Sequence, residues 1–153
     1  MIEIRKATPN DMEQVLDMRY TTIKSVCNLH KEHIFDRNFQ DCTRAYYANA
    51  DQTTVLAWND KVPIGCATIC YILLMPTFDH PSGKRAHIMN VYVDKKYRRQ
   101  GIALKMMEML MDEAKEKGVT EISLDATEEG RLLYEQLGFK ASTEGMVLEI
   151  QQY

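Results

Sequence analysis

The sequence contains no apolar run long enough to cross a lipid bilayer. Its longest run, residues 69–75, is far shorter than the roughly 20 apolar residues that a membrane helix needs. The N-terminal residues 1–6 also lack the apolar core of a secretory signal. The sequence therefore predicts a cytoplasmic chain with no membrane partner.

Patterns for disulfides and structural metals are missing too. The four cysteines are Cys27, Cys42, Cys66 and Cys70; none forms a Cys-x-x-Cys pair, and no histidine stands at ligand spacing from them. We interpret them as buried free thiols and expect no metal. A strong charge excess is also lacking, because 19 Lys and Arg against 22 Asp and Glu give a net charge of −3. Composition thus provides no electrostatic argument for binding nucleic acid.

The chain has the length and composition of one compact domain. It has 153 residues, of which 45% are hydrophobic and 27% charged, values ordinary for a soluble protein. We find no repeat and no linker, and expect a single domain over 1–153.

Hydrophobic periodicity alternates between strand and helix along the chain. Helices are predicted from residue 9 to about 27 and over 35–50, 101–117 and 128–137, with Phe39, Cys42, Tyr46 and, as a further candidate, Tyr47 on the buried side of the second. Strands are predicted over 2–5, 53–58, 62–75, 85–93, 120–124, 139–141 and 146–150, the last two joined around 144–145. This order predicts an α/β (α+β) fold around one sheet.

One turn in this pattern has the features of an anion site. The strand that ends in Val91-Tyr92-Val93 leads into a polar turn and then an amphipathic helix. The first backbone N–H groups of a helix lack intrahelical partners and lie at the positive end of its dipole. These groups belong to Gln100, Gly101, Ile102 and Ala103, with Arg98 and Arg99 beside them. No Gly-Lys-Ser/Thr sequence follows, and there is only one glycine, which excludes a Walker A loop and a dinucleotide fingerprint.

The fixed positions of this turn, Arg98-x-x-Gly101-x-Ala103, resemble the GNAT superfamily of acetyl-CoA-dependent N-acyltransferases. A second segment, residues 127–139, is similar to the family pattern Asn-x-x-Ala-x-x-x-Tyr-x-x-x-Gly-Phe, with Thr127 and Gly130 in place of the Asn and Ala. The resemblance implies a single mixed, mostly antiparallel sheet of about six to seven strands, flanked by helices, whose central strands splay apart.

The resemblance also implies acetyl-CoA as cosubstrate and assigns its binding residues. The pyrophosphate is expected on the backbone of Arg98 to Ala103, and the pantetheine arm on main-chain groups of Val91 and Val93. The expected cofactor-binding residues are Val91, Tyr92, Val93, Arg98, Arg99, Gln100, Gly101, Ile102, Ala103 and Thr127. For Thr127 a helix N-cap is an equally good interpretation.

Tyr134 matches the tyrosine that the family places near the sulfur of the cofactor. The resemblance therefore assigns it as the general acid for the leaving thiolate, with an ordinary pKa of about 10. The alternative is a tyrosine that packs its ring and exposes its hydroxyl.

The general base is not assigned by the sequence. His87, Asn90 and Tyr92 lie on the strand expected to face the acyl group, with His87 on the opposite face from the other two by alternation. Water relayed through Glu32 is a further candidate. We expect the acceptor pocket to come from the loops at 28–33 and 78–82, because loops usually determine specificity.

The resulting hypothesis is an N-acetyltransferase that moves acetyl directly from acetyl-CoA to a primary amine of a small molecule in a ternary complex. Two alternatives stay open: a protein or peptide amine as acceptor, and a non-catalytic acyl-CoA-binding regulatory module. A protein that binds ATP or NAD at the same helix terminus is disfavoured by the missing glycine motifs. The family also leads us to expect a homodimer.

Overall fold

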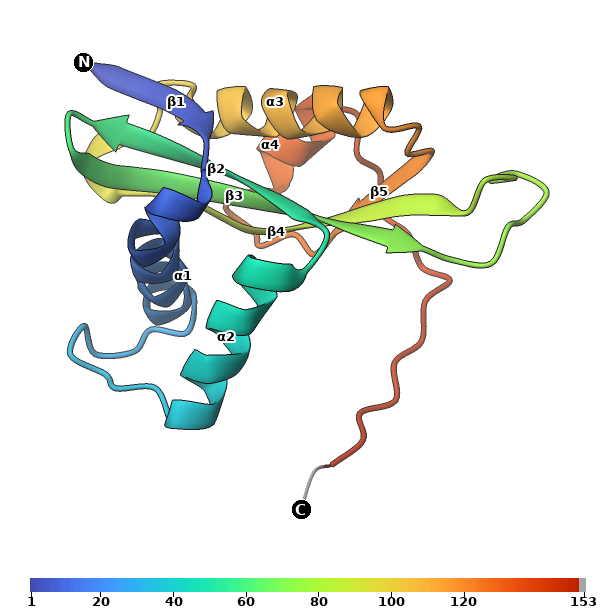
Figure 1. The fold of residues 1–153 in the computed structure, drawn as a ribbon. Helices are drawn as coiled ribbons and strands as arrows, with labels where there is room; N and C mark the ends of the chain where they lie inside the picture. The colour runs from blue at the N-terminus through green and yellow to red at the C-terminus, as the bar shows by residue number, and fades with distance from the viewer. Residues whose placement is uncertain (152–153) are drawn as a thin grey trace.

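The computed structural model describes residues 1–151, which form one five-stranded sheet with helices on both faces (Figure 1). The strand order is β1-β2-β3-β4-β5, and every neighbouring pair is antiparallel except β4 and β5, which run parallel. The strands are β1 (Ile2–Lys6), β2 (Gln52–Asn59), β3 (Val62–Leu73), β4 (Lys84–Val93) and β5 (Glu121–Leu124). The mixed, mostly antiparallel sheet is confirmed, with five strands rather than six to seven.

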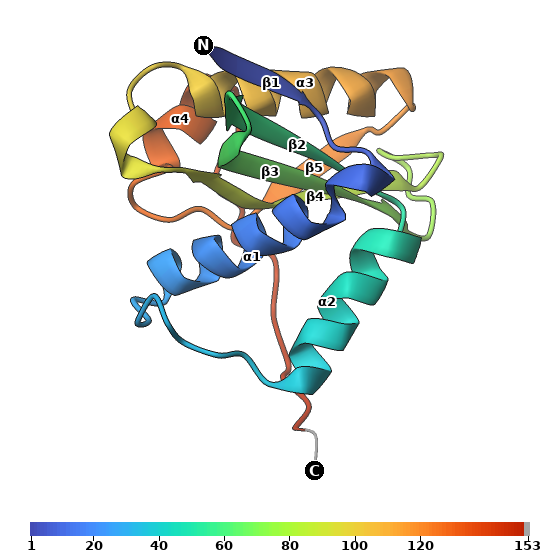
Figure 2. The ribbon, with the colours of Figure 1, turned by 60° about the vertical axis from the view of Figure 1, so that its left-hand side comes forward.

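The helices form two layers. Helices α1 (Met12–Val26) and α2 (Arg37–Asn49) cover one face of the sheet, and α3 (Ile102–Glu116) and α4 (Arg131–Gln136) lie on the other (Figures 1 and 2). Two short 3-10 turns, Pro9–Asp11 and Lys95–Tyr97, lead into α1 and toward α3. None of the helices over residues 1–151 is long and apolar enough to span a bilayer.

The main core lies between the sheet and α3. The stripe predicted on α3 is buried, since Met106, Met107 and Leu110 are completely inaccessible to solvent. They pack against β-branched and small residues of β2, β3 and β4, a combination that fills the pleated surface. A smaller cluster under α1 contains Met18, Leu56, Trp58 and Cys66. Helix α3 is therefore firmly anchored, and its N-terminus is held at one position beside the end of β4.

Helix α2 differs from its predicted packing. Cys42 and Tyr46 are exposed, and the side facing the protein carries Phe39, Thr43 and Tyr47, which are half-buried. Phe39 and Tyr47 thus face the protein as predicted. The three residues recur every four positions, beginning three residues after the N-cap Asp36, so the inward stripe is narrow and includes the polar Thr43. All four cysteines are free, as predicted, but only Cys66 is buried. Cys27 and Cys42 are exposed, and Cys70 is half-buried.

The two strands predicted at the C-terminus are absent. Residues 139–151 have no regular structure and run away from the sheet (Figures 1 and 2). Met146, Val147, Leu148 and Ile150 are 84–97% exposed. The prediction of these strands is wrong, because a strand needs a partner for its backbone, and this segment finds none within the described part of the chain.

Candidate active site

The sheet opens between β4 and β5. Strand β4 pairs with β5 only from Arg85 to Ile88, opposite Glu121 to Leu124. Beyond Ile88 the two strands separate, and the β5-facing edge of β4 has no strand neighbour as far as Val93. A cavity of about 820 Å³ lies along this edge, lined by residues of α1, β4 and the turn before α4. The splayed central strands that the resemblance implied are therefore present.

The predicted anion turn lies at one end of this gap. Gly101 adopts a left-handed conformation with φ of 77°, and a Cβ built there would touch nothing within 4 Å. The first helical bond of α3 runs from the Lys105 N–H to the Gly101 carbonyl at 3.0 Å. No carbonyl of residues 1–151 accepts the N–H groups of residues 100–104, so these donors face open space at the positive end of the helix. The geometry suits a phosphate.

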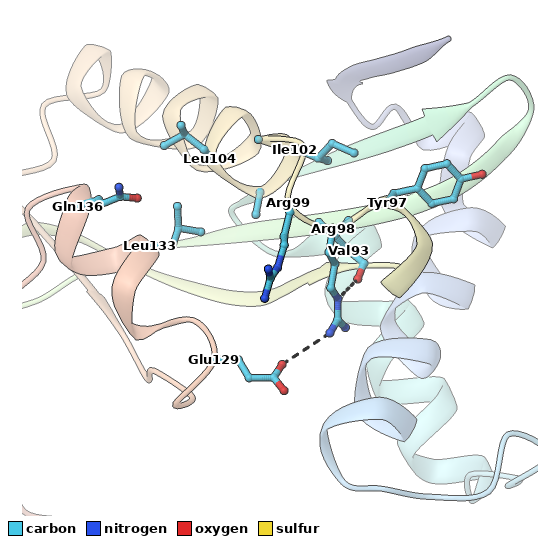
Figure 3. A pocket seen from close by; sticks show the side chains of 11 residues that line it. Val93, Tyr97, Arg98, Arg99, Ile102, Leu104, Glu129, Leu133 and Gln136 are labelled. Carbon is cyan, nitrogen blue, oxygen red and sulfur yellow. Dashed lines mark hydrogen bonds and ion pairs between the residues drawn. The ribbon is translucent and has the colours of Figure 1, made fainter.

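The two arginines of this turn differ in their bonding. Arg98 Nε donates to the Val93 carbonyl at 2.8 Å, and its guanidinium approaches Glu129 at 3.6 Å, which ties the end of β4 to the turn before α4 (Figure 3). Arg99 has no such partner and extends into the second cavity, of about 490 Å³, between the turn and α4 (Figure 3). Both cavities are lined by Val93, Arg98 and Leu133, so they adjoin. Arg98 forms part of the wall that both cavities share, whereas Arg99 is available to a ligand.

A bulge in β4 determines which side chains face α1. Asn90 and Val91 together oppose Ala67 of β3, and Asn90 has a left-handed φ of 61°. His87, Met89 and Tyr92 pair with Cys70, Thr68 and Cys66, which alternate along β3 and therefore share one face. The expectation that His87 faces away from Tyr92 is wrong, because the extra residue shifts the alternation.

Tyr134 projects from α4 into the larger cavity. Its ring packs edge-on against Phe139 at 6.1 Å, and burial raises the pKa of its phenol above the ordinary value. No hydrogen bond within residues 1–151 uses its hydroxyl. The ring also lies against Gly130, where an added Cβ would come within 2.8 Å of Cε2. Tyr134 is thus held in position by packing, and its protonated hydroxyl forms no hydrogen bond within residues 1–151.

Other predicted residues divide into those that line the cavity and those that do not. Thr127 lines it, although its Oγ1 also accepts from the Gly130 N–H at 3.2 Å as a turn cap. His87 is outside the lining; its Nδ1 is 2.7 Å from Ser123 Oγ. Glu32 and the two loops at 28–33 and 78–82 contribute nothing to either cavity, and His80 of the second loop instead bonds Thr120 of the opposite sheet end at 2.8 Å.

Helix α1 supplies the missing wall. Arg19, Thr22 and Ser25 line the larger cavity across from the turn before α4. Their spacing of three residues places them on one helical face, a signal that was visible in the sequence but overlapped the apolar stripe of Met18 and Ile23. Within residues 1–151, no three His, Cys, Asp or Glu side chains are grouped as metal ligands.

Comparison with solved structures gives matches over nearly the whole chain. A predicted acetyltransferase from Clostridium acetobutylicum, solved with acetyl-CoA, is 27% identical with a TM-score of 0.85 over 97% of this chain and 96% of that one. A GCN5-related N-acetyltransferase from Ralstonia eutropha JMP134 is 25% identical with a TM-score of 0.81, covering 98% and 99%.

Curated relatives match over shorter stretches. The glucosamine 6-phosphate N-acetyltransferase of Arabidopsis thaliana is 29% identical over 104 residues, which are 68% of this chain and 67% of that protein. Its counterpart from Trypanosoma brucei brucei is 30% identical over 79 residues, so that this match spans about half of each, 52% and 54%. The model of the acetyltransferase (GNAT) family matches residues 18–139. This match includes the anion turn, the splayed strands and Tyr134, and the chain therefore belongs to the acetyltransferase (GNAT) family.

Proposed function

We propose that the protein transfers the acetyl group of acetyl-CoA directly to a primary amine of a small molecule. The observation that carries the proposal is the continuity of the two cavities. They join the free N–H groups of residues 100–104 to the hydroxyl of Tyr134 along the unpaired edge of β4. In this arrangement the turn holds the pyrophosphate, assisted by Arg99, and main-chain groups of Val91 and Val93 hold the pantetheine amides as a neighbouring strand would.

The proposed chemistry needs no covalent enzyme intermediate. The neutral amine nitrogen attacks the thioester carbonyl and forms the C–N bond, and collapse of the tetrahedral intermediate breaks the C–S bond with the electron pair on sulfur. Tyr134 donates its proton to this sulfur, and the proton released from nitrogen returns through water to the tyrosinate. The ordinary pKa of a tyrosine already lies well above neutral pH, and burial raises that of Tyr134 further, so the proton is present when it is needed. The buried Cys66 is not a nucleophile candidate, since burial raises the pKa of its thiol to about 12.

The small-molecule acceptor is supported by the curated relatives, whose names specify the amino sugar glucosamine 6-phosphate. A cavity of about 820 Å³ is also of the size that encloses small ligands. Acceptance of a peptide amine instead would appear as faster acetylation of N-terminal or lysine peptides than of amino sugars and amino acids in a mass-spectrometric screen.

The cofactor site is tested by calorimetric titration with acetyl-CoA, CoA, ATP and NAD. Asn tolerates the left-handed conformation at position 101 and has nearly the shape of Asp, so Gly101→Asn and Gly101→Asp differ mainly by one negative charge. We expect acetyl-CoA binding to survive in Gly101→Asn and to be at least 10-fold weaker in Gly101→Asp, because a fixed carboxylate there repels the pyrophosphate. Equal affinities would remove the turn from the binding site. Tight binding without transfer to any amine would support the regulatory module.

The role of Tyr134 is tested with Tyr134→Phe, which removes only the hydroxyl. General acid catalysis typically contributes about 10²- to 10⁴-fold, so kcat should fall by about 100-fold or more while the KM for acetyl-CoA changes little. An unchanged kcat would eliminate Tyr134 as the acid.

We also propose that two copies associate through the segment 146–150. Four of the five residues of this segment are apolar and it has no strand partner, while β5 has β4 as its only strand neighbour within residues 1–151. Pairing the segment of one copy with the open edge of β5 in the other would cover both. Light scattering after gel filtration should give the dimer mass for the full chain and the monomer mass for Leu148→Asp; a monomeric full chain at micromolar concentration would contradict this.

A further inference from the structure

Two arginines lack a carboxylate partner within the part of the chain that the structure describes, residues 1–151. Six of the eight lie within 4.0 Å of an Asp or Glu oxygen: Arg5, Arg37, Arg44, Arg85, Arg98 and Arg131. Within residues 1–151 the two exceptions are Arg99, at the anion turn, and Arg19, on α1. Arg99 already has an assigned ligand in the cofactor phosphates. Arg19 is half-buried, lines the larger cavity, and is not among the residues that we expect to bind the cofactor.

The contacts of Arg19 fix its position without neutralising its charge. Its Nη1 donates to Asn90 Oδ1 at 3.0 Å, and this neutral amide is its one hydrogen-bond partner within the described residues. A guanidinium has five N–H donors and no acceptor, so the remaining donors are available to the cavity. Burying part of a cation among neutral groups costs free energy, and hydrogen bonds to a bound anion offset this cost.

Asn90 is itself held rigidly. Its carbonyl accepts from the Cys66 thiol at 3.2 Å, and its Nδ2 donates to the same sulfur at 3.4 Å, which directs Oδ1 toward Arg19. Cys66 is buried, and Asn90 occupies the left-handed position of the bulge. The bulge therefore holds a pre-oriented arginine at the wall of the larger cavity, which Val91 also lines.

The carboxylates that line the same cavity come from a different element. Asp125, Glu128 and Glu129 belong to the turn before α4; Glu129 pairs with Arg98, and none of the three lies within 4.0 Å of Arg19. An acceptor that crosses the cavity thus meets negative charge on one wall and one uncompensated positive charge on the α1 wall.

We propose that Arg19 binds an anionic group of the acceptor, a carboxylate or a phosphate, so that the substrates are small amines with a negative charge. This inference rests on the proposed function and names its substrate class. A guanidinium binds either anion with two parallel hydrogen bonds, and charge-assisted bonds of this kind discriminate strongly against neutral analogues.

The experiment compares acceptors that differ only in charge. Glucosamine 6-phosphate is paired with glucosamine, and serine and glutamate are paired with their α-amides, in steady-state transfer and in calorimetric binding to the CoA-saturated protein. We expect the wild type to prefer the charged member of at least one pair, and the pair concerned distinguishes phosphate from carboxylate. Arg19→Met should raise the KM for that acceptor by about 10- to 100-fold and leave the neutral member unchanged, and Arg19→Lys should restore part of the preference.

Arg99→Met is the matched control, because it removes the other unpaired arginine. It should weaken acetyl-CoA and leave the charged-to-neutral ratio unchanged. Three results would overturn the inference: no preference for any charged acceptor, equal losses for charged and neutral acceptors in Arg19→Met, or the same change of ratio in Arg99→Met. The proposed function has a separate test: it would be wrong if the wild type did not bind acetyl-CoA. In that case the binding of acceptor anions to the wild type and to Arg19→Met can still be compared without CoA.

Discussion

The contact between Gly130 and Tyr134 yields the sharpest test of the catalytic geometry. A Cβ at position 130 would lie 2.8 Å from Cε2 of Tyr134, 3.2 Å from Cζ and 3.3 Å from the hydroxyl oxygen. The backbone of Gly130 is in the right-handed helical region, with φ of −85° and ψ of −14°, so alanine fits the main chain without strain. Gly130→Ala therefore acts on the tyrosine ring and not on the fold.

The size of the effect follows from these distances. The ring edge must move by about 0.6 Å to regain an ordinary van der Waals separation. A misplacement of about 1 Å at a catalytic group can cost about 10²-fold, so we expect kcat to fall by about 10-fold. Replacing glycine at a helical position usually stabilises a protein by about 0.4–1 kcal/mol, so the free energy of unfolding should change by no more than about 1 kcal/mol. Activity and stability should respond separately.

A double-mutant cycle with Tyr134→Phe provides the assay. Steady-state kcat is measured for the wild type, both single variants and the double variant, with urea unfolding as the control for folding. If alanine acts by moving the hydroxyl, it should cost little further activity once the hydroxyl is gone. The same 10-fold loss in both backgrounds, or no loss in the wild-type background, would refute the reasoning.

Three further predictions concern stability and reactivity. The Arg5 guanidinium, at 2.7 Å, lowers the pKa of Asp11 to about 2, so this carboxylate stabilises the fold above its unfolded-state pKa of about 4 and loses that effect as pH falls through 2. Asp11→Asn should thus lower the free energy of unfolding by about 1–2 kcal/mol at pH 7, discounted because Arg5 is partly exposed, and by almost nothing below pH 2, as measured by urea titration. An aromatic disulfide reagent should label the exposed thiols within minutes and Cys66 only on unfolding, since Cys66 is 1% exposed and its thiol pKa is raised to about 12; rapid labelling of Cys66 would contradict its burial. Leu110→Ala should lower the free energy of unfolding by about 2–5 kcal/mol in urea, because Leu110 is completely buried under α3, and a loss below 1 kcal/mol would mean that the core collapses around the gap.

Local patterns predicted the elements that frame the site. The strand ending at Val93, the turn through Gly101 and the stripe of α3 were recognised because each depends on residues close in sequence. The left-handed conformations of Gly118 and Gly138 fit the predicted helix ends for the same reason. What failed was pairing over a distance: the C-terminal residues had the pattern of strands but no partner strand within residues 1–151.

The cavity wall formed by α1 was not predicted, for a different reason. Arg19 lies among the apolar residues of α1, and nothing in the nearby sequence shows that it faces Asn90, which is 71 positions away. It stands out only through the ion pairs within residues 1–151, because an arginine without a carboxylate can be recognised only when the partners of the others are known. The sequence predicted an acceptor pocket from loops; these loops line neither cavity, whereas a face of α1 lines the larger one.

The bulge at Asn90 has a consequence for engineering this protein. Because two residues of β4 oppose one residue of β3, the alternation of side chains between the two faces of the sheet shifts by one residue at the bulge. Deleting Asn90 would leave Val91 alone opposite Ala67, so Met89 and Tyr92 would keep their partners Thr68 and Cys66 and their common face. The deletion would remove the partner of Arg19 without rotating the strand. Inserting one residue elsewhere in β4, without a second bulge, would instead turn the side chains on one side of the insertion to the opposite face. The strand can therefore lose its bulge residue, but it cannot gain a residue without turning part of the cavity wall away from the cavity.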